Sequence, residues 1–226
     1  MHRKQIYLFD LDGTLTDPGQ GITNSVMYAL DKFGIHETDR TALYKFIGPP
    51  LLDSFQIFYR MSPEQAEQAV AAYREYFSVT GLFENRVYEG IPALLQVLRA
   101  EGKTLAMATS KPEIFAVRIL EKFDLAKYFH YVGAASLDSS RSQKADVIRH
   151  ALHLCGDPDP DTVLMIGDRK HDILGAIENK IQSVGVLYGY GDRPELEQAG
   201  ADAIAESVIH LKELLLSSGG CMGLQK

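Results

Sequence analysis

The sequence has few cysteines and no long apolar run. Its 226 residues include only Cys155 and Cys221, which provide neither a disulfide framework nor the ligand spacing of a metal site. The first apolar run is too short for a signal peptide and leads directly into charged residues. No stretch is long and apolar enough to span a bilayer. We therefore expect a cytoplasmic protein with no membrane partner, in which Cys155 is packed or inert.

Long runs of basic residues are also missing. The formal net charge is −7, and the basic cluster His2-Arg3-Lys4 is too short to act as an arm that binds nucleic acid. We therefore expect no nucleic acid polymer as a partner. The hydrophobic content of 46% and the charged content of 23% are typical of a soluble globular protein.

Short apolar runs alternate with helical patterns along most of the chain. This alternation predicts an α/β fold, a Rossmann-like, doubly wound parallel sheet with helices on both faces. Glycines stand where three of the helices should stop, at Gly102, Gly156 and Gly200. The expected strands are 5–9, 104–109, 131–134, 162–166, 183–187 and 203–205, and the expected helices are 91–100, 112–123, 144–154, 171–179, 194–199 and 207–216.

One stretch, residues 17–83, is helical throughout and interrupts the alternation. Asp17-Pro18 opens a first helix, which Gly34 ends. The sequence Ser62-Pro63-Glu64-Gln65 is a capping box that opens another helix. We interpret this stretch as a small helical cap domain inserted after the first strand. Such an insertion places it over the ligand crevice, because that crevice lies at the carboxyl ends of parallel strands.

The insertion divides the rest of the chain into a catalytic core made of two segments and a C-terminal tail. Residues 1–16 and 84–216 form the α/β catalytic core, with hinge loops at about 15–18 and 81–89. Residues 217–226 are expected to be a flexible tail.

The first candidate site is Asp10-Leu11-Asp12-Gly13-Thr14, which follows the first apolar run. Two aspartates two positions apart on an extended chain point the same way, and their carboxylates repel each other unless a cation or a proton lies between them. The stretch therefore suits a hard metal ion, a nucleophilic aspartate or both. A plain turn that caps the strand is the alternative, because Asp-Gly is a common turn pair.

Two further candidate sites also lie at strand ends or helix starts. Thr109 closes a strand, and residues 110–113 are predicted to form a capping box, so the free N–H groups there and the hydroxyls of Thr109 and Ser110 would suit a phosphate. Lys144 begins a helix, where a cation opposes the helix dipole. The simple alternatives are a capping serine and a solvated lysine. A nearby acidic cluster with a bound phosphate would instead make Lys144 a counter-charge.

The fourth candidate site is Gly167-Asp168 with Asp172. Asp168 follows a buried type of strand, and Asp172 lies one turn into the next helix, on the same face. An aspartate that caps the helix is the alternative. Taken together, the four sites gather acids, a hydroxyl and a lysine at one edge of a parallel sheet. This combination favours metal-assisted phosphoryl transfer.

These residues resemble the motifs of the haloacid dehalogenase superfamily of phosphohydrolases. Its first motif, Asp-x-Asp-Gly-Thr, is matched by 10–14, its second by Thr109, its third by Lys144, and its fourth by Gly167-Asp168 with Asp172. The order and spacing agree over about residues 5–206, and the insertion resembles the family's helical cap. Residues 46–51 and 186–191 resemble the phosphoglycolate phosphatase and 5′-nucleotidase-like branch. Arg169 departs from the Ser or Thr of many relatives, and its cation would alter the metal's outer shell or contact the substrate.

The resemblance implies a Mg²⁺-dependent phosphoric monoester hydrolase. Asp10 would attack phosphorus to form an aspartyl-phosphate, and Asp12 would protonate the leaving alcohol and then activate water. Magnesium would be held by the Asp10 carboxylate, the Asp12 main-chain carbonyl and Asp168. Asp172 would be a ligand through water or would orient Lys144. Thr109, Ser110 and Lys144 would hold the phosphoryl group, with Gly13 supporting the first motif.

The substrate is expected to be a small phosphate ester, and phosphoglycolate, a nucleoside monophosphate or a sugar phosphate would fit equally well. The cap residues proposed to select it are Tyr44, Lys45, Phe46 and Arg60. One alternative is a phosphomutase, which shares the core. Another is a phospho-accepting switch like a bacterial receiver domain, although receivers are much shorter and lack the insertion. The sequence does not determine the oligomeric state.

Overall fold

The computed structural model describes residues 4–138 and 140–216, so the predicted tail at 217–226 and Cys221 lie outside it. The chain divides into two compact units. The first unit contains the residues up to Leu15 and those from Tyr88 onward, and the second is Thr16–Val87. Within the described ranges, no helix combines the length and the apolar character that crossing a membrane requires.

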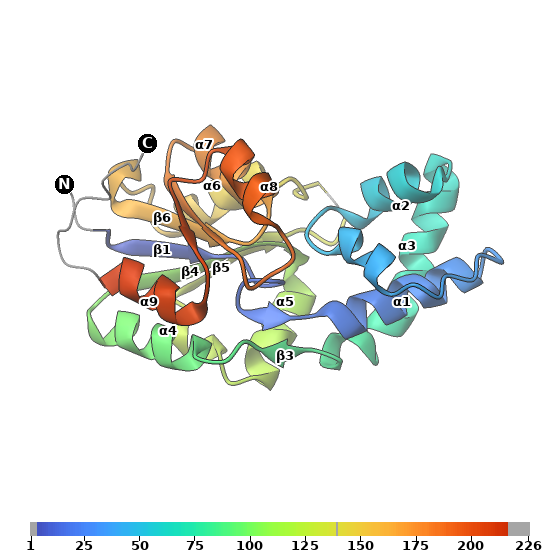
Figure 1. The fold of residues 1–226 in the computed structure, drawn as a ribbon, viewed down its shortest axis with the longest axis horizontal. Coiled ribbons are helices and arrows are strands. Elements are labelled where there is room, and N and C mark those ends of the chain that lie inside the picture. Colours follow the sequence, from blue (N-terminus) through green and yellow to red (C-terminus); the bar gives the residue numbers. More distant parts are fainter. Residues whose placement is uncertain (1–3, 139, 217–226) are drawn as a thin grey trace. The chain divides into compact units, whose positions relative to one another are not determined.

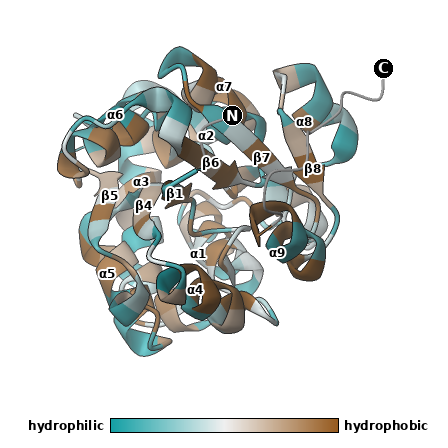
Figure 2. Cartoon of the chain, turned by 90° about the vertical axis from the view of Figure 1, so that its left-hand side faces the viewer, coloured by the Kyte–Doolittle hydropathy of each residue, from teal (hydrophilic) through white to brown (hydrophobic). Residues whose placement is uncertain are grey.

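A six-stranded parallel sheet forms the centre of the first unit (Figure 1), and its strands follow the order β5-β4-β1-β6-β7-β8 (Figure 2). In β1, Ile6 lies opposite Thr104 on one side and Val163 on the other. All four residues of β1 are buried, as expected for a parallel sheet covered on both faces. The predicted α/β fold class is confirmed. The strands are β1 (Ile6–Phe9), β4 (Thr104–Pro112), β5 (Tyr131–Ala135), β6 (Val163–Gly167), β7 (Gln182–Val186) and β8 (Ala203–Ala205).

Helices cover both faces of this sheet. Helices α6 and α7 lie on one face, and α4, α5 and α9 lie on the other (Figure 2). In α4 the buried side chains are Ile91, Leu94, Leu95 and Leu98, the spacing that gives a helix one apolar face. The helices of the first unit are α4 (Ile91–Ala100), α5 (Glu113–Lys122), α6 (Lys144–Leu154), α7 (Lys170–Glu178), α8 (Arg193–Ala199) and α9 (Val208–Leu216), with short 3-10 helices at Ala126–Tyr128 and Pro160–Thr162.

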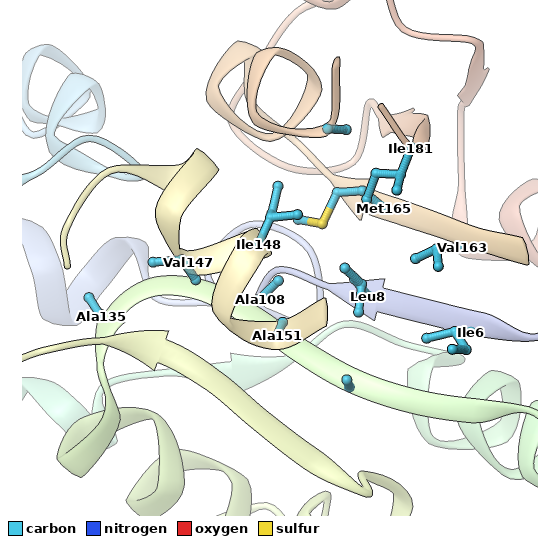
Figure 3. Close-up of a cluster of buried hydrophobic side chains, with 12 residues drawn as sticks. Ile6, Leu8, Ala108, Ala135, Val147, Ile148, Ala151, Val163, Met165 and Ile181 are labelled. Atoms are coloured by element: carbon cyan, nitrogen blue, oxygen red, sulfur yellow. The ribbon is translucent and has the colours of Figure 1, made fainter. Parts of the chain in front are cut away.

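A hydrophobic core fills the layer between the sheet and helix α6. Leu8 of β1 and Met165 of β6 are fully buried there, together with Val147 and Ile148 of α6 (Figure 3). These aliphatic side chains hold the start of α6, and therefore Lys144, at a defined place beside the sheet. The core thus fixes the framework from which the polar residues project at the carboxyl ends of the strands.

Strand β4 differs from its prediction. We predicted that it ends at Thr109 and that a capping box at 110–113 opens the next helix. Instead, β4 continues to Pro112, and α5 begins at Glu113 with no side-chain hydrogen bond from its cap residue Pro112. The predicted capping box is therefore wrong. Pairing with β5 continues beyond Thr109, with a shift in register before Pro112, and this long-range pairing overrides the local capping pattern.

The second unit, Thr16–Val87, is built mainly from three helices. They are α1 (Gly19–Asp31), α2 (Leu51–Tyr59) and α3 (Pro63–Phe77), with 3-10 helices at Thr41–Phe46 and Gly81–Phe83. The capping box at the start of α3 is confirmed, since the Gln65 N–H donates to Ser62 Oγ and the Ser62 N–H to Gln65 Oε1. Such a cap stabilises a helix by about 1 kcal/mol.

The four residues proposed to select the substrate have different surroundings in this unit. Phe46 is buried and packs edge-on against Phe55, so it belongs to the unit's core. The Lys45 ammonium lies 4.7 Å from the ring centre of Phe58. Tyr44 and Arg60 are exposed, and Arg60 follows α2 in a left-handed conformation. Exposure therefore leaves Tyr44 and Arg60 better placed than Phe46 to meet a ligand.

A short antiparallel ribbon joins the two ends of the second unit. Strand β2 (Thr16–Asp17) pairs with β3 (Arg86–Val87), with Thr16 opposite Val87. The Arg86 guanidinium donates to Asp17 Oδ2 at 2.7 Å across the ribbon. We predicted loops at 15–18 and 81–89, so the ribbon and the 3-10 helix at Gly81–Phe83 are corrections. Strands of two residues carry no periodic signal in the sequence.

Candidate active site

Asp10 lies directly after β1, at the carboxyl edge of the sheet. Its N–H donates to the Ile166 carbonyl of β6 at 2.9 Å. The backbone of Asp10 therefore continues the pairing of β1 with β6, while its side chain lies beyond the end of the strand. The side chain is buried. The chain then turns, with the Leu15 N–H donating to the Leu11 carbonyl at 2.9 Å. This turn brings Asp12, Gly13 and Thr14 beside the end of β6.

Gly13 makes the closest approach in this turn. Its φ is +82°, and a Cβ there would lie 2.1 Å from Asp168 Oδ2. A side chain is therefore excluded both by the backbone conformation and by the neighbouring carboxylate.

Lys144 is the first residue of α6, and its side chain is buried among acids. Its Nζ lies 2.9 Å from Asp10 Oδ1 and 2.7 Å from Asp172 Oδ1, and it also donates to the Ala108 carbonyl at 3.1 Å. Burial by itself lowers the pKa of Lys144, but the carboxylates of Asp10 and Asp172 outweigh that effect and raise the pKa above its usual value. The lysine is therefore charged at neutral pH, and its pairing with the two acids explains its otherwise unfavourable place at a helix start.

Asp168 and Asp172 follow β6 and are both fully buried. Asp168 Oδ2 accepts from the Tyr190 N–H at 2.7 Å, and Asp168 Oδ1 accepts from Thr14 Oγ1 at 3.4 Å. Asp172 Oδ2 accepts from the Arg169 N–H at 3.0 Å. Burial raises the pKa of Asp172 to about 6 and that of Asp168 well above its usual range. Both acids are thus costly to hold in charged form without a further cation.

The three buried acids form a candidate metal site. Asp10, Asp168 and Asp172 each offer a carboxylate oxygen, and these oxygens lie within 4.8 Å of one another. Lys144 supplies one positive charge to the group, which leaves an excess of negative charge in a buried place. Oxygen ligands and this excess charge fit a hard divalent cation such as Mg²⁺. The three carboxylates fit such an ion because they are oxygen ligands and because they are buried.

Asp12 is held separately from the three acids. Its Oδ2 lies 2.7 Å from Lys111 Nζ. Burial raises the pKa of Asp12, and the Lys111 ammonium partly offsets this rise. The sequence interpretation missed Lys111. Its position two residues after Thr109 at a strand end is a signal that could have found it.

Thr109 and Ser110 have different environments. Thr109 is buried and its Oγ1 accepts from the Lys111 N–H at 3.2 Å. Ser110 lies inside β4, so its N–H is not at a helix N-terminus as we expected. Lys144 reaches the same strand through the Ala108 carbonyl, one residue before Thr109. The structure therefore gathers Asp10, Lys144, Asp168 and Asp172 directly, with this part of β4 beside Lys144.

A loop after β7 covers the turn of the first motif. Tyr188 Oη donates to the Thr14 carbonyl at 3.1 Å. A Cβ on Gly189 would lie 2.3 Å from the Gly13 carbonyl oxygen, and one on Gly191 would lie 2.0 Å from the Asp168 carbonyl oxygen. The two glycines thus let this loop touch both acidic turns. The sequence indicated 186–191 only as a mark of one branch of the family, and not as part of the site.

Arg169 is directed toward α8. Its Nε lies 2.9 Å from Glu195 Oε1, and the same carboxylate oxygen accepts from the Lys170 N–H at 2.8 Å. Arg169 therefore links the turn before α7 to α8. The expectation that its cation alters the metal's outer shell or contacts the substrate stays a prediction.

Comparison with known proteins identifies relatives along nearly the whole chain. The model of the haloacid dehalogenase-like hydrolase family matches residues 7–186. A 5′-nucleotidase of Pseudomonas aeruginosa is 46% identical over 210 residues, covering 93% of this chain and 95% of its own. Tyrosine-protein kinase PtkA of Mycobacterium tuberculosis is 38% identical over 213 residues, covering 93% of this chain and 72% of its own. The crystal structure of a predicted phosphatase from Clostridium acetobutylicum is 47% identical, with a TM-score of 0.93 over 95% of this chain and 99% of that chain.

Proposed function

We propose that this chain, which belongs to the haloacid dehalogenase-like hydrolase family and is a phosphatase, hydrolyses a small phosphomonoester with Mg²⁺ through an aspartyl-phosphate on Asp10. The observation that carries the proposal is the pairing of Asp10 with Lys144 beside Asp168 and Asp172. A carboxylate held by an ammonium group and surrounded by other acids suits attack on a phosphate ester.

The proposed reaction has two steps that use different acids. Asp10 attacks phosphorus, and Asp12 donates a proton to the leaving oxygen. Asp12 then takes a proton from water as the water attacks the aspartyl-phosphate. Lys144 and Thr109 stabilise the negative charge of the phosphoryl group. The separate ion pair of Asp12 with Lys111 supports this division of roles.

The residues that would hold Mg²⁺ are the Asp10 carboxylate, the Asp12 main-chain carbonyl and Asp168. The ion would supply positive charge to neutralise the phosphate oxygens and the carboxylates. Asp172 would orient Lys144, which its 2.7 Å contact with the ammonium supports. Tyr190 would keep Asp168 in place through its N–H.

Substrate choice is proposed to lie in the helical unit Thr16–Val87, which is inserted between the first two motifs. The name of the Pseudomonas relative favours a nucleoside 5′-monophosphate as the first ester to test, with phosphoglycolate and sugar phosphates beside it. Tyr44 and Arg60 are the cap positions to vary first, because Phe46 is buried.

A phosphate-release screen tests the proposal. Purified protein is incubated with Mg²⁺ and a panel of nucleoside monophosphates, phosphoglycolate and sugar phosphates, with Asp10→Asn as the matched control. We expect wild type to release phosphate repeatedly and the variant to release none. A single stable phosphorylation by acetyl phosphate would instead indicate a phospho-accepting switch. An isomerised sugar phosphate would indicate a phosphomutase. Phosphotyrosine formed from ATP and a tyrosine peptide would indicate a kinase.

A further inference from the structure

A second buried lysine contacts the first motif. Lys111 Nζ lies 2.7 Å from Asp12 Oδ2, with the side chains only 6% and 12% exposed. Lys144 lies between Asp10 and Asp172. The two aspartates of the motif are therefore held by different lysines, although one residue separates them in the sequence.

An irregularity in β4 places Lys111 in this position. Thr109 pairs with Ala134 of β5, and the register shifts before Pro112 pairs with Ala135. Such a bulge re-aims the side chains of the residues that it contains. The Lys111 N–H donates to Thr109 Oγ1 at 3.2 Å, which supports the bulged backbone. Lys111 is thus held both at its backbone and at its ammonium group.

The ion pair leaves the two oxygens of Asp12 in different states. Oδ2 is held by Lys111, whereas Oδ1 is buried and has no hydrogen-bond partner within residues 4–138 and 140–216. A buried carboxylate oxygen without a partner is costly. Since Lys111 restricts the rotation of the carboxyl group, Oδ1 is the oxygen available to a leaving group or to water.

We propose that Lys111 is a positioning residue that orients Asp12 for proton transfer, an inference that rests on the proposed phosphatase mechanism. In the first step, Asp10 bonds to phosphorus, the bond from phosphorus to the leaving oxygen breaks, and the Asp12 Oδ1 proton moves to that oxygen. In the second step, Oδ1 takes a proton from water, the water oxygen bonds to phosphorus, and the bond from phosphorus to Asp10 breaks. Lys111 keeps its protons in both steps.

Esters with different leaving groups test this role. An alkoxide needs a proton as it leaves, whereas p-nitrophenolate leaves readily without one. Because general acid catalysis contributes about 10²–10⁴-fold, we expect Lys111→Met to lower kcat about 100-fold on the alkyl ester that wild type hydrolyses best. On p-nitrophenyl phosphate we expect a loss of less than about tenfold, with KM nearly unchanged on both. Lys111→Arg retains a cation and should recover most of the loss on the alkyl ester.

Lys103 provides the matched control. It is also buried, it directly precedes β4, and its Nζ donates to the Lys4 carbonyl at 2.8 Å, at the end of the strand opposite to Lys111. Lys103→Met should reduce stability, but any loss of kcat should be the same on the alkyl ester and on p-nitrophenyl phosphate. If Lys111→Met folds poorly, Lys111→Gln provides the same comparison.

Three outcomes would overturn the inference. If Lys111→Met loses the same factor in kcat on both esters, Lys111 is a general structural residue. If KM rises greatly while kcat is unchanged, Lys111 is a substrate-binding residue. A leaving-group effect that persists undiminished in an Asp12→Ala background would show that it does not act through Asp12. A wild-type protein that hydrolyses neither ester would overturn the proposed function itself, which separates the two failures.

Discussion

The Lys144 ammonium lies 2.7 Å from Asp172 Oδ1, with both side chains buried. The two residues belong to α6 and α7, whose first turns meet beside the end of β1. The same ammonium lies 2.9 Å from Asp10 Oδ1, so Asp172 holds in place the cation that faces the proposed nucleophile.

Replacing Lys144 by methionine should damage both stability and activity. The buried acids Asp10 and Asp172 lose their cation, which should cost about 3–5 kcal/mol in the free energy of unfolding. We expect kcat to fall at least about 10²–10³-fold, because a charge aimed at the reacting group is removed. Urea unfolding and steady-state kinetics measure the two effects. Activity within about tenfold of wild type would contradict the proposed role of Lys144.

Asp10→Asn should abolish turnover while changing stability little, because the amide keeps the shape of the carboxyl group and removes one charge from an acidic cluster. Asp12→Ala should instead slow phosphorylation of the protein and make the phosphoenzyme long-lived, because water is then not activated. Mass spectrometry after mixing with substrate detects the added phosphoryl group. An active Asp10→Asn protein would contradict the assignment of the nucleophile.

Removal of metal should stop the reaction. We expect EDTA to abolish phosphate release and added Mg²⁺ to restore it. Asp168→Asn should raise the Mg²⁺ concentration needed for half-maximal activity at least about tenfold, because a carboxylate ligand is replaced by a neutral one. Thermal shift titrations with Mg²⁺ give a readout independent of turnover. Full activity in EDTA would argue against the proposed metal site at Asp10, Asp12 and Asp168.

Gly13→Ala tests the close approach of the first motif to Asp168. Alanine at a positive φ costs about 1–2 kcal/mol by itself, and at Gly13 the new Cβ would also lie 2.1 Å from Asp168 Oδ2. Gly102 is the control, since its φ is +73° and nothing lies within 4 Å of a Cβ there. We expect Gly102→Ala to lower the free energy of unfolding only by the cost of alanine at a positive φ. Gly13→Ala should lower it further and should also lose most of its Mg²⁺-dependent activity. If chemical denaturation shows the same loss of stability for both variants, the structure relieves the contact between the new Cβ at position 13 and Asp168.

Cys155 should react slowly with alkylating reagents. Burial raises the pKa of its thiol to about 11, and only the thiolate is nucleophilic. At pH 8 the thiolate fraction is therefore about 100-fold smaller than that of an ordinary cysteine of pKa about 8.5–9. Iodoacetamide labelling followed by peptide mass spectrometry should show a rate at Cys155 that rises as the pH approaches 11. Labelling as fast as that of glutathione at pH 8 would contradict this expectation.

Much of the fold could be predicted because its signals are local. The bounds of α4 and α6 match their predicted ranges, since each helix has an apolar stripe and a clear end. The positive φ of Gly102, Gly156 and Gly200 likewise agrees with their predicted places at helix ends. The ribbon of β2 and β3 and the continuation of β4 were not predicted, because pairing between distant segments produces them.

The sequence by itself determined the order of strands and helices and the family motifs, because periodicity and short motifs are properties of neighbouring residues. Only the tertiary structure decided the contacts of the individual charges. It placed Lys111 on Asp12, Arg169 on Glu195, and Lys144 on both Asp10 and Asp172, where the family resemblance had indicated only Asp172 as a residue that would orient Lys144. These pairs join residues far apart in the chain, and their geometry depends on strand register, a bulge and helix packing. Local patterns of the sequence do not encode those features, so the roles of individual charges at this site required the folded chain.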